Sequence, residues 1–403
     1  MSKTPRPVPR KPTAAPVEDN DVLAQSLAEL ALDLSEREHA EEEDSAALHL
    51  KEDEFNKLVR NALRKKNDEA LYGAIERARF TDVGAYQYAR SHIEEAAATI
   101  LLRKHGGPAM EVNAFALPLF VQSFGGLKEA DGFQDGDAFV ELVESFKKAG
   151  LESPGAKVVM ISHAYDVDEA ARISYSDLNE MARDAATAMT EKKLVATPAL
   201  ERSMVGWAPS GFEPGDKAVE LRYLLGFALK RADDPFYQAP AGEAAADAYY
   251  EQRMARYRSW TAQAGPLVQR CLALDPDGLQ VHFLYQDLFF GAREQGMEEL
   301  SMLRVISELG GALEAIAGGA EAIVGPADVD DMMVLRISLT GPDGAPLGYS
   351  EKPLDLAADL ASEVRDVHEA LATLGVEKVS VTVRFGPDGL PHEMQPYPGT
   401  EAA

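Results

Sequence analysis

Residues 162–169 read Ser-His-Ala-Tyr-Asp-Val-Asp-Glu and hold the side chains best suited to chemistry in this chain. A histidine beside carboxylates can accept or donate a proton near neutral pH. The segment follows residues 157–162, a continuous apolar run typical of a strand buried on both faces. In open α/β sheets, ligands bind beyond the carboxyl ends of the strands. The candidate catalytic residues of a small-molecule site are therefore Ser162, His163, Asp166 and Asp168.

A structural interpretation of the same segment is that Asp166 caps the following helix and His163 completes a turn, since helix caps are commoner than sites. If the functional interpretation holds, the protein is a small-molecule enzyme of hydrolytic type, or a ligand sensor. The two interpretations differ in whether these groups converge in a pocket.

The sequence lacks the established signatures of nucleotide, serine-hydrolase and zinc-protease sites. Its eight histidines are scattered, with no pair at ligand spacing. The single cysteine, Cys271, excludes an internal disulfide and thiol–metal clusters, and it is expected to be a small buried apolar residue. We expect no metal and no cofactor, and the chain is more typical of a binding protein than of an enzyme.

Residues 249–270 interleave arginines with aromatic residues, a combination that can hold phosphates and stack on bases. The formal net charge of -27 argues against nucleic-acid binding, because a negative surface repels phosphates. Pairing of these arginines with the protein's own carboxylates is the plainer interpretation. A clamp onto the acidic run at residues 36–54 is a third.

A leucine stripe provides the candidate partner-binding surface. Leu23, Leu27, Leu30 and Leu34 fall on one face of a helix. Proline-rich residues 1–20 precede the stripe and the acidic run follows it, so residues 1–54 are predicted to be a disordered arm that carries one short amphipathic helix. Residues 20–35 either dock in a groove of a protein partner or fold back on their own domain.

The fold prediction is α+β (mixed α/β), with repeated strand-helix-strand units and antiparallel hairpins at the C-terminus. Two extended runs each end in Gly-Pro-Asp-Gly, at residues 341–344 and 386–389, and a helix lies between them, which predicts a ββαββ unit. The predicted segments are a helical one at 55–110, a first α/β region at 111–240 and a second at 241–403. Homodimerisation through edge strands of the last unit is left open.

No stretch has the roughly 18 uncharged apolar residues of a membrane span, and the N-terminus lacks the apolar core of a secretory signal. We therefore expect a cytoplasmic protein, and the alanine-rich composition suggests a bacterial one. The first functional hypothesis is a binding or regulatory protein that acts through protein contacts. The alternative is the small-molecule site described above.

Overall fold

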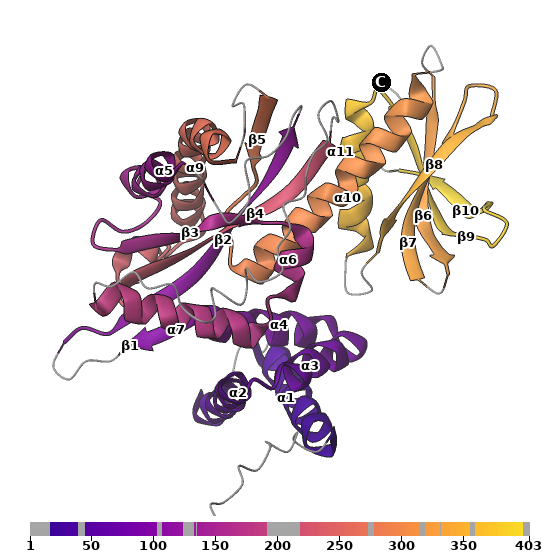
Figure 1. Ribbon diagram of the computed structural model, residues 1–403. Helices are drawn as coiled ribbons and strands as arrows, with labels where there is room; N and C mark the ends of the chain where they lie inside the picture. Colours follow the sequence, from indigo (N-terminus) through magenta and orange to yellow (C-terminus); the bar gives the residue numbers. More distant parts are fainter. Residues whose placement is uncertain are drawn as a thin grey trace, which may run out of the picture. The chain divides into compact units, whose positions relative to one another are not determined.

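A computed structural model describes residues 17–38, 45–102, 107–123, 133, 135–191, 218–272, 278–314, 319–330, 332–354 and 359–397. The chain divides into two compact units, one of Met1–Ile100 with Ser174–Arg183 and one of Leu101–Ile173 with Asp184–Ala403. The first is helical, and the second contains two largely antiparallel sheets with helices packed on them (Figure 1). The predicted mixed α+β class is confirmed.

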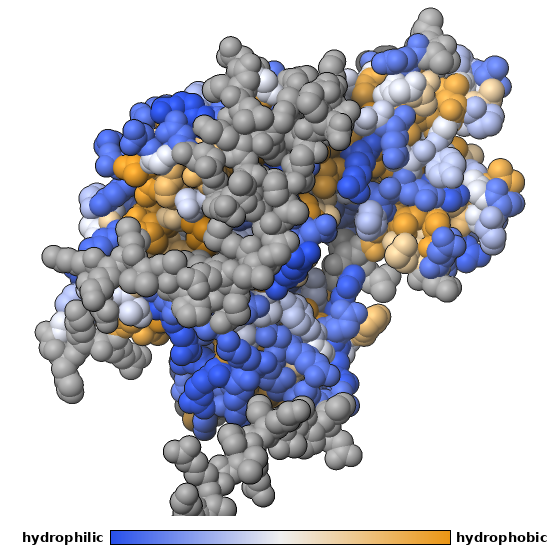
Figure 2. Space-filling model, in the orientation of Figure 1, coloured by the Kyte–Doolittle hydropathy of each residue, from blue (hydrophilic) through white to orange (hydrophobic). Residues whose placement is uncertain are grey.

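The first unit is built from helices that bury apolar stripes against one another. They are α1 (Val17–Glu38), α2 (Ser45–Lys65), α3 (Asp68–Thr81), α4 (Val83–Ala98) and the first part of α7 (Tyr175–Glu191). The Asn67 and Asp82 side chains cap α3 and α4 by accepting hydrogen bonds from backbone N–H groups of the first turn. The visible outer face of these helices is largely hydrophilic, which suits a self-contained core (Figure 2).

The N-terminal region differs from the predicted disordered arm where it is described. Helix α2 begins at Ser45, inside the acidic run, and continues to Phe55 and Val59, which are fully buried. Asp53 and Glu54 of the acidic run are exposed on a helix whose inner face packs in the core, which charge counting alone does not reveal. Residues 1–16 and 39–44 lie outside the described residues.

The first sheet has the order β1-β2-β4-β3, and β5 also pairs with β2. The pairings of β2 with β4, β2 with β5 and β3 with β4 are antiparallel. Because β5 belongs to this sheet, the predicted boundary at residue 240 divides one layer of structure. The strands are β1 (Thr99–Leu102), β2 (Met110–Ser123), β3 (Lys157–Tyr165), β4 (Ala218–Arg231) and β5 (Leu279–Phe283).

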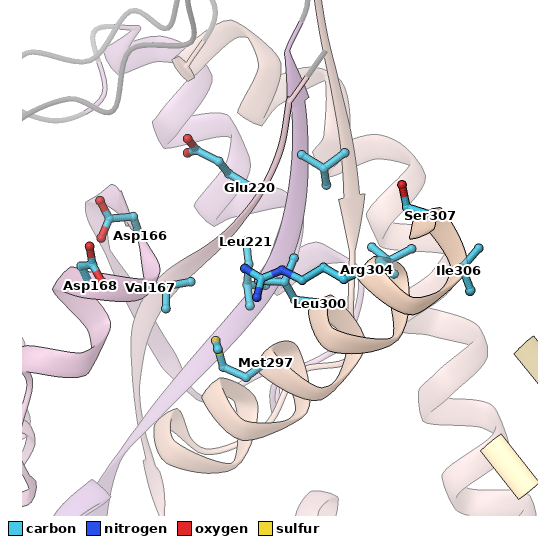
Figure 3. Close-up of a pocket in the computed structure, with 12 residues that line it drawn as sticks. Asp166, Val167, Asp168, Glu220, Leu221, Met297, Leu300, Arg304, Ile306 and Ser307 are labelled. Carbon is cyan, nitrogen blue, oxygen red and sulfur yellow. The ribbon is translucent and has the colours of Figure 1, made fainter. Parts of the chain in front are cut away.

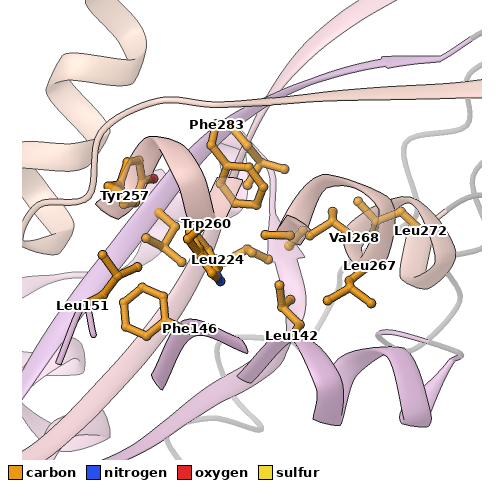
Figure 4. Close-up of a cluster of buried hydrophobic side chains, with 14 of the residues drawn as sticks. Leu142, Phe146, Leu151, Leu224, Tyr257, Trp260, Leu267, Val268, Leu272 and Phe283 are labelled. Carbon is orange, nitrogen blue, oxygen red and sulfur yellow. The ribbon is translucent and has the colours of Figure 1, made fainter. Parts of the chain in front are cut away.

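Helices α5 (Gly136–Lys148) and α9 (Glu243–Leu272) cover one face of this sheet. Phe115 of β2 lies across Gly226 of β4, at a position where any Cβ would collide with the ring. Its ring stacks on Phe146, which meets the edge of Trp260 (Figure 4). These aromatic contacts form the centre of the core on this face of the sheet, because each ring buries a large apolar area.

The opposite face of the sheet contacts α6 (Val167–Arg172) and α10 (Phe289–Leu313). Gly296 allows α10 to approach β4 closely, since a Cβ there would lie 3.1 Å from the methyl groups of Leu221 and 3.3 Å from the hydroxyl of Tyr223. The rest of α10 contacts β8 and α11 (Leu360–Thr373) of the second sheet.

The second sheet has the order β10-β9-β6-β7-β8. The predicted ββαββ unit is present, and each Gly-Pro-Asp-Gly segment forms a hairpin turn with its last glycine at positive φ. The prediction missed β6, which pairs antiparallel with β7 and parallel with β9 and so lies between the two hairpins. The strands are β6 (Glu321–Val329), β7 (Met332–Thr340), β8 (Pro346–Pro353), β9 (Lys378–Phe385) and β10 (Pro391–Pro396).

A buried cation joins α10 and α11 to the second sheet. The Lys352 side chain on β8 is 1 % exposed and pairs with Glu298 of α10 and, at 2.6 Å, with Glu363 of α11. Burial by itself would lower the pKa of Lys352, but hydrogen bonds from its ammonium to these two carboxylates raise the pKa above its usual value. The lysine is therefore charged at neutral pH.

Replacing this cation should destabilise the second sheet strongly. Lys352→Met leaves Glu363 without its partner, so we expect the free energy of unfolding in urea to fall by roughly 3 kcal/mol. The matched control is Lys378→Met, whose exposed pair with Glu321 is expected to contribute far less to stability. Equal losses in the two variants would contradict a structural role for the buried pair.

Candidate functional site

A pocket of about 780 Å³ opens where three separate parts of the second unit meet (Figure 3). One wall is the start of α6, with Asp166, Val167 and Asp168. The second wall is formed by residues near the start of β4, and the third is one side of α10. The remaining lining residues are Val219, Glu220, Leu221, Met297, Leu300, Leu303, Arg304, Ile306 and Ser307.

Antiparallel pairing explains why the α6 and β4 walls are neighbours. Tyr165, at the end of β3, pairs with Tyr223, near the start of β4. Residues that follow β3 therefore lie beside residues that begin β4, although some fifty positions separate them. The rule for parallel sheets that motivated the prediction does not apply here, since β3 runs antiparallel to its neighbour.

Two of the predicted residues, Asp166 and Asp168, line this pocket. Asp166 is also the N-cap of α6: its side chain accepts a hydrogen bond from the Glu169 backbone at 2.8 Å, and Glu169 accepts one from the Asp166 backbone at 3.1 Å. This reciprocal capping box fixes the first turn of the helix. Asp168, one position into the first turn, is exposed to the pocket.

His163 does not line the pocket. Its side chain is fully buried, and Nε2 lies 2.9 Å from the carboxylate of Glu169, which is 5 % exposed. The ring also packs edge-on against Tyr165. The pair lies behind the capping box, so His163 supports the turn that carries Asp166 and Asp168 rather than facing a ligand.

Ser162 and His163 are not arranged as a nucleophile and its base. Ser162 is exposed while His163 is buried, as expected for neighbours that point to opposite faces of a strand. The strand itself differs from the prediction of two buried faces: Val158, Val159 and Met160 are partly exposed, because β3 is the last strand in its sheet order. The geometry gives no support to a hydrolytic role for Ser162.

Helix α10 contributes most of the pocket's apolar surface. Met297, Leu300, Arg304 and Ser307 recur at helical spacing and therefore share a face. None of these residues was among the predicted site residues, because an apolar stripe on a helix is usually core. The signal that was overlooked is the arginine and serine within that stripe.

A second group of buried polar side chains lies elsewhere in the same unit. The Tyr237 hydroxyl, in the 3-10 helix Pro235–Tyr237, donates to Glu152 at 2.5 Å, and the Lys230 ammonium sits 3.5 Å over the tyrosine ring. Burial raises the pKa of Glu152, against the opposing effects of Tyr237, Lys230 and Arg253. Ser153 donates to Asp234 at 2.6 Å. These bonds hold together the segments that carry Glu152, Ser153, Asp234 and Tyr237.

Several arginine and aromatic residues of α9 contact the rest of the second unit. Tyr257 and Trp260 point into the core, and the Trp260 indole donates to Ser145 at 2.9 Å. Arg270 pairs with Asp135 at 3.0 Å, and Arg253 and Arg256 lie within hydrogen-bonding range of backbone carbonyls after α5. Arg270 therefore meets a carboxylate, the partner that was predicted, whereas Arg253 and Arg256 meet backbone carbonyls.

The leucine stripe of α1 faces the helical core. Leu27 and Leu34 are 0 % and 1 % exposed, while Leu23 and Leu30 are partly covered. Helix α1 contacts α2, α3 and α4. The fold-back alternative accounts for the two buried leucines, and docking of residues 20–35 on a partner stays a prediction.

Comparison with protein-family models, with curated proteins and with solved structures finds no match to this chain. The described residues contain no cluster of three or more histidine, cysteine, aspartate or glutamate side chains placed to hold a metal ion. Among the described helices, none combines the length and apolar character needed to cross a bilayer. Function is therefore inferred from the geometry of the pocket.

The support that His163 and Glu169 give to the pocket can be measured. Glu169→Ala removes half of the capping box and the partner of a buried imidazole, so we expect the free energy of unfolding to fall by about 3 kcal/mol. The control, Asp168→Ala, changes an exposed carboxylate in the same turn and should cost less than ~1 kcal/mol. A Glu169→Ala variant as stable as Asp168→Ala would show that the pair is dispensable.

The leucine stripe can be tested in the same way. Leu27→Ala should lower the free energy of unfolding by roughly 3 kcal/mol, because it leaves a cavity in the helical core. Val22→Ala, at a position 66 % exposed on the same helix, should change it by less than ~0.5 kcal/mol. A neutral effect of Leu27→Ala would favour docking on a partner instead.

Proposed function

We propose that this protein binds a small molecule in the pocket formed by α6, β4 and α10, and that it acts as a ligand sensor rather than as a catalyst. The observation that carries the proposal is the pocket's wall. Val219, Met297 and Leu303 are 43 %, 38 % and 39 % exposed, and all three line the same pocket. Large apolar side chains gathered in a concave site favour binding, because a ligand removes them from water.

The polar groups of the pocket support binding rather than catalysis. Asp166 is occupied as a helix cap, and Glu220 holds Arg222 through two hydrogen bonds of 2.8 Å and 3.0 Å. Ser162 and His163, the nucleophile and base that a hydrolytic role would need, do not line the pocket. A few fixed polar groups over an apolar wall can orient a ligand without transforming it.

A second candidate function is protein binding through the second sheet. On this sheet, Arg336 lies over the rings of Tyr349 and Phe385. Hydrophobic side chains reach the surface of this part of the molecule among hydrophilic ones (Figure 2). The exposed large apolar residues of the sheet are Met332, Met333, Tyr349, Val383, Leu390 and Met394. Such exposure favours a contact surface through which a sensor could act.

The test is a ligand screen on the full chain with a variant that fills the pocket. We expect at least one member of a library of small metabolites to raise the melting temperature of the wild type, since a ligand that binds only the folded state stabilises it. Met297→Trp should remove that shift by occupying the pocket. Met332→Trp, at an exposed methionine of the second sheet, should retain it.

Two results would contradict the proposal. One is that no compound in the library raises the melting temperature of the wild type. The other is a compound that stabilises Met297→Trp as much as the wild type, which would place its site outside this pocket.

A further inference from the structure

The charged groups of the pocket divide into those with protein partners and those without. Asp166 caps α6 and Glu220 pairs with Arg222. The Asp168 carboxylate and the Arg304 guanidinium form no ion pair or side-chain hydrogen bond with any of the described residues. A ligand therefore meets one available anion and one available cation.

These two groups belong to different walls. Asp168 comes from the first turn of α6, and Arg304 comes from α10, where its side chain extends past Leu300 toward the α6 side of the pocket (Figure 3). Apolar side chains lie between the two walls, with Leu221 beside Arg304 and Val167 beside Asp168. Ser307 lies one helical turn beyond Arg304, and the Arg304 guanidinium extends away from its hydroxyl (Figure 3).

We infer that the ligand is a short apolar peptide with free termini, a deduction that rests on the proposed ligand-binding function. Its carboxylate would bind Arg304, its ammonium would bind Asp168, and its apolar side chains would cover Leu221, Met297 and Leu300. A ligand with one charge would satisfy only one of the two groups. A purely anionic ligand would also face three carboxylates in the pocket and a chain of net charge -27.

The size of the pocket agrees with this class. At about 780 Å³ it is far larger than a single amino acid requires and lies within the ordinary range, roughly 300–1,000 Å³, for sites that hold drug-sized ligands. An extended peptide of a few apolar residues separates its two charged ends by several bonds, so that it can reach opposite walls of the pocket.

Trileucine, N-acetyl-trileucine and trileucine amide are the probes, and binding to the full-length protein is measured by calorimetry. Each blocked peptide lacks one terminal charge and should bind about tenfold more weakly than trileucine, because a charge-assisted hydrogen bond is lost. Arg304→Gln should bind trileucine about tenfold more weakly and no longer distinguish it from the amide. Asp168→Asn should bind trileucine and N-acetyl-trileucine with equal affinity, because the partner of the peptide ammonium is gone.

Two matched substitutions control for general charge effects. Arg258→Gln removes an exposed arginine of α9, and Asp137→Asn removes an exposed aspartate at the equivalent position of α5. Both variants should bind all three peptides as the wild type does. All four substituted side chains are exposed, so the variants are expected to fold. Thermal denaturation of each variant checks this.

The inference fails if trileucine does not bind, or if the blocked peptides bind as tightly as the free one. It also fails if the control substitutions weaken binding as much as Arg304→Gln and Asp168→Asn do. The proposed function survives these results when the metabolite screen still finds a ligand that Met297→Trp excludes. If neither the peptides nor the library bind in the pocket, both proposals fail.

Discussion

Helix α10 is the element on which the second unit depends, because it belongs to two hydrophobic layers at once. Its first half lies so close to β4 that a Cβ at position 296 would crowd Leu221 and Tyr223. Its second half places Val305 and Leu309 in the core of the other sheet. Between these contacts, Glu298 pairs with the buried Lys352. A helix fixed at both ends by close packing cannot shift locally without disturbing both layers.

The packing of α10 against both sheets also connects the pocket to the second sheet. Leu221, which Gly296 allows close to α10, lines the pocket, and Met297 and Leu300 follow on the exposed side of the helix. Glu298 and Glu308, on the same helix, hold Lys352 and Ser350 of β8. A ligand that displaced α10 would therefore act directly on the partners of β8. Packed elements of this kind tend to change between discrete arrangements rather than deform gradually, which is what a sensor requires.

Local sequence signals predicted the local structure well. The Gly-Pro-Asp-Gly turns and the cap at Asp166 depend on residues within a few positions of one another, and each is present. Strand β6 was missed because Gly325 and Pro326 interrupt its apolar run, and its place in the sheet depends on pairing with β9, more than fifty residues away. The predicted strand at β3 was present, but its position in the sheet order could not be read from its composition.

The candidate site shows the same division between local and distant information. Residues 162–169 were singled out because a histidine stands beside carboxylates, and that histidine is buried. What makes the place a pocket is the arrival of Arg304 and its neighbours on a helix 130 residues later. His163 and Glu169 therefore act as structural support behind the pocket, since they hold the turn that presents Asp168. The available charges, rather than the most reactive side chains, therefore decide what the pocket can bind.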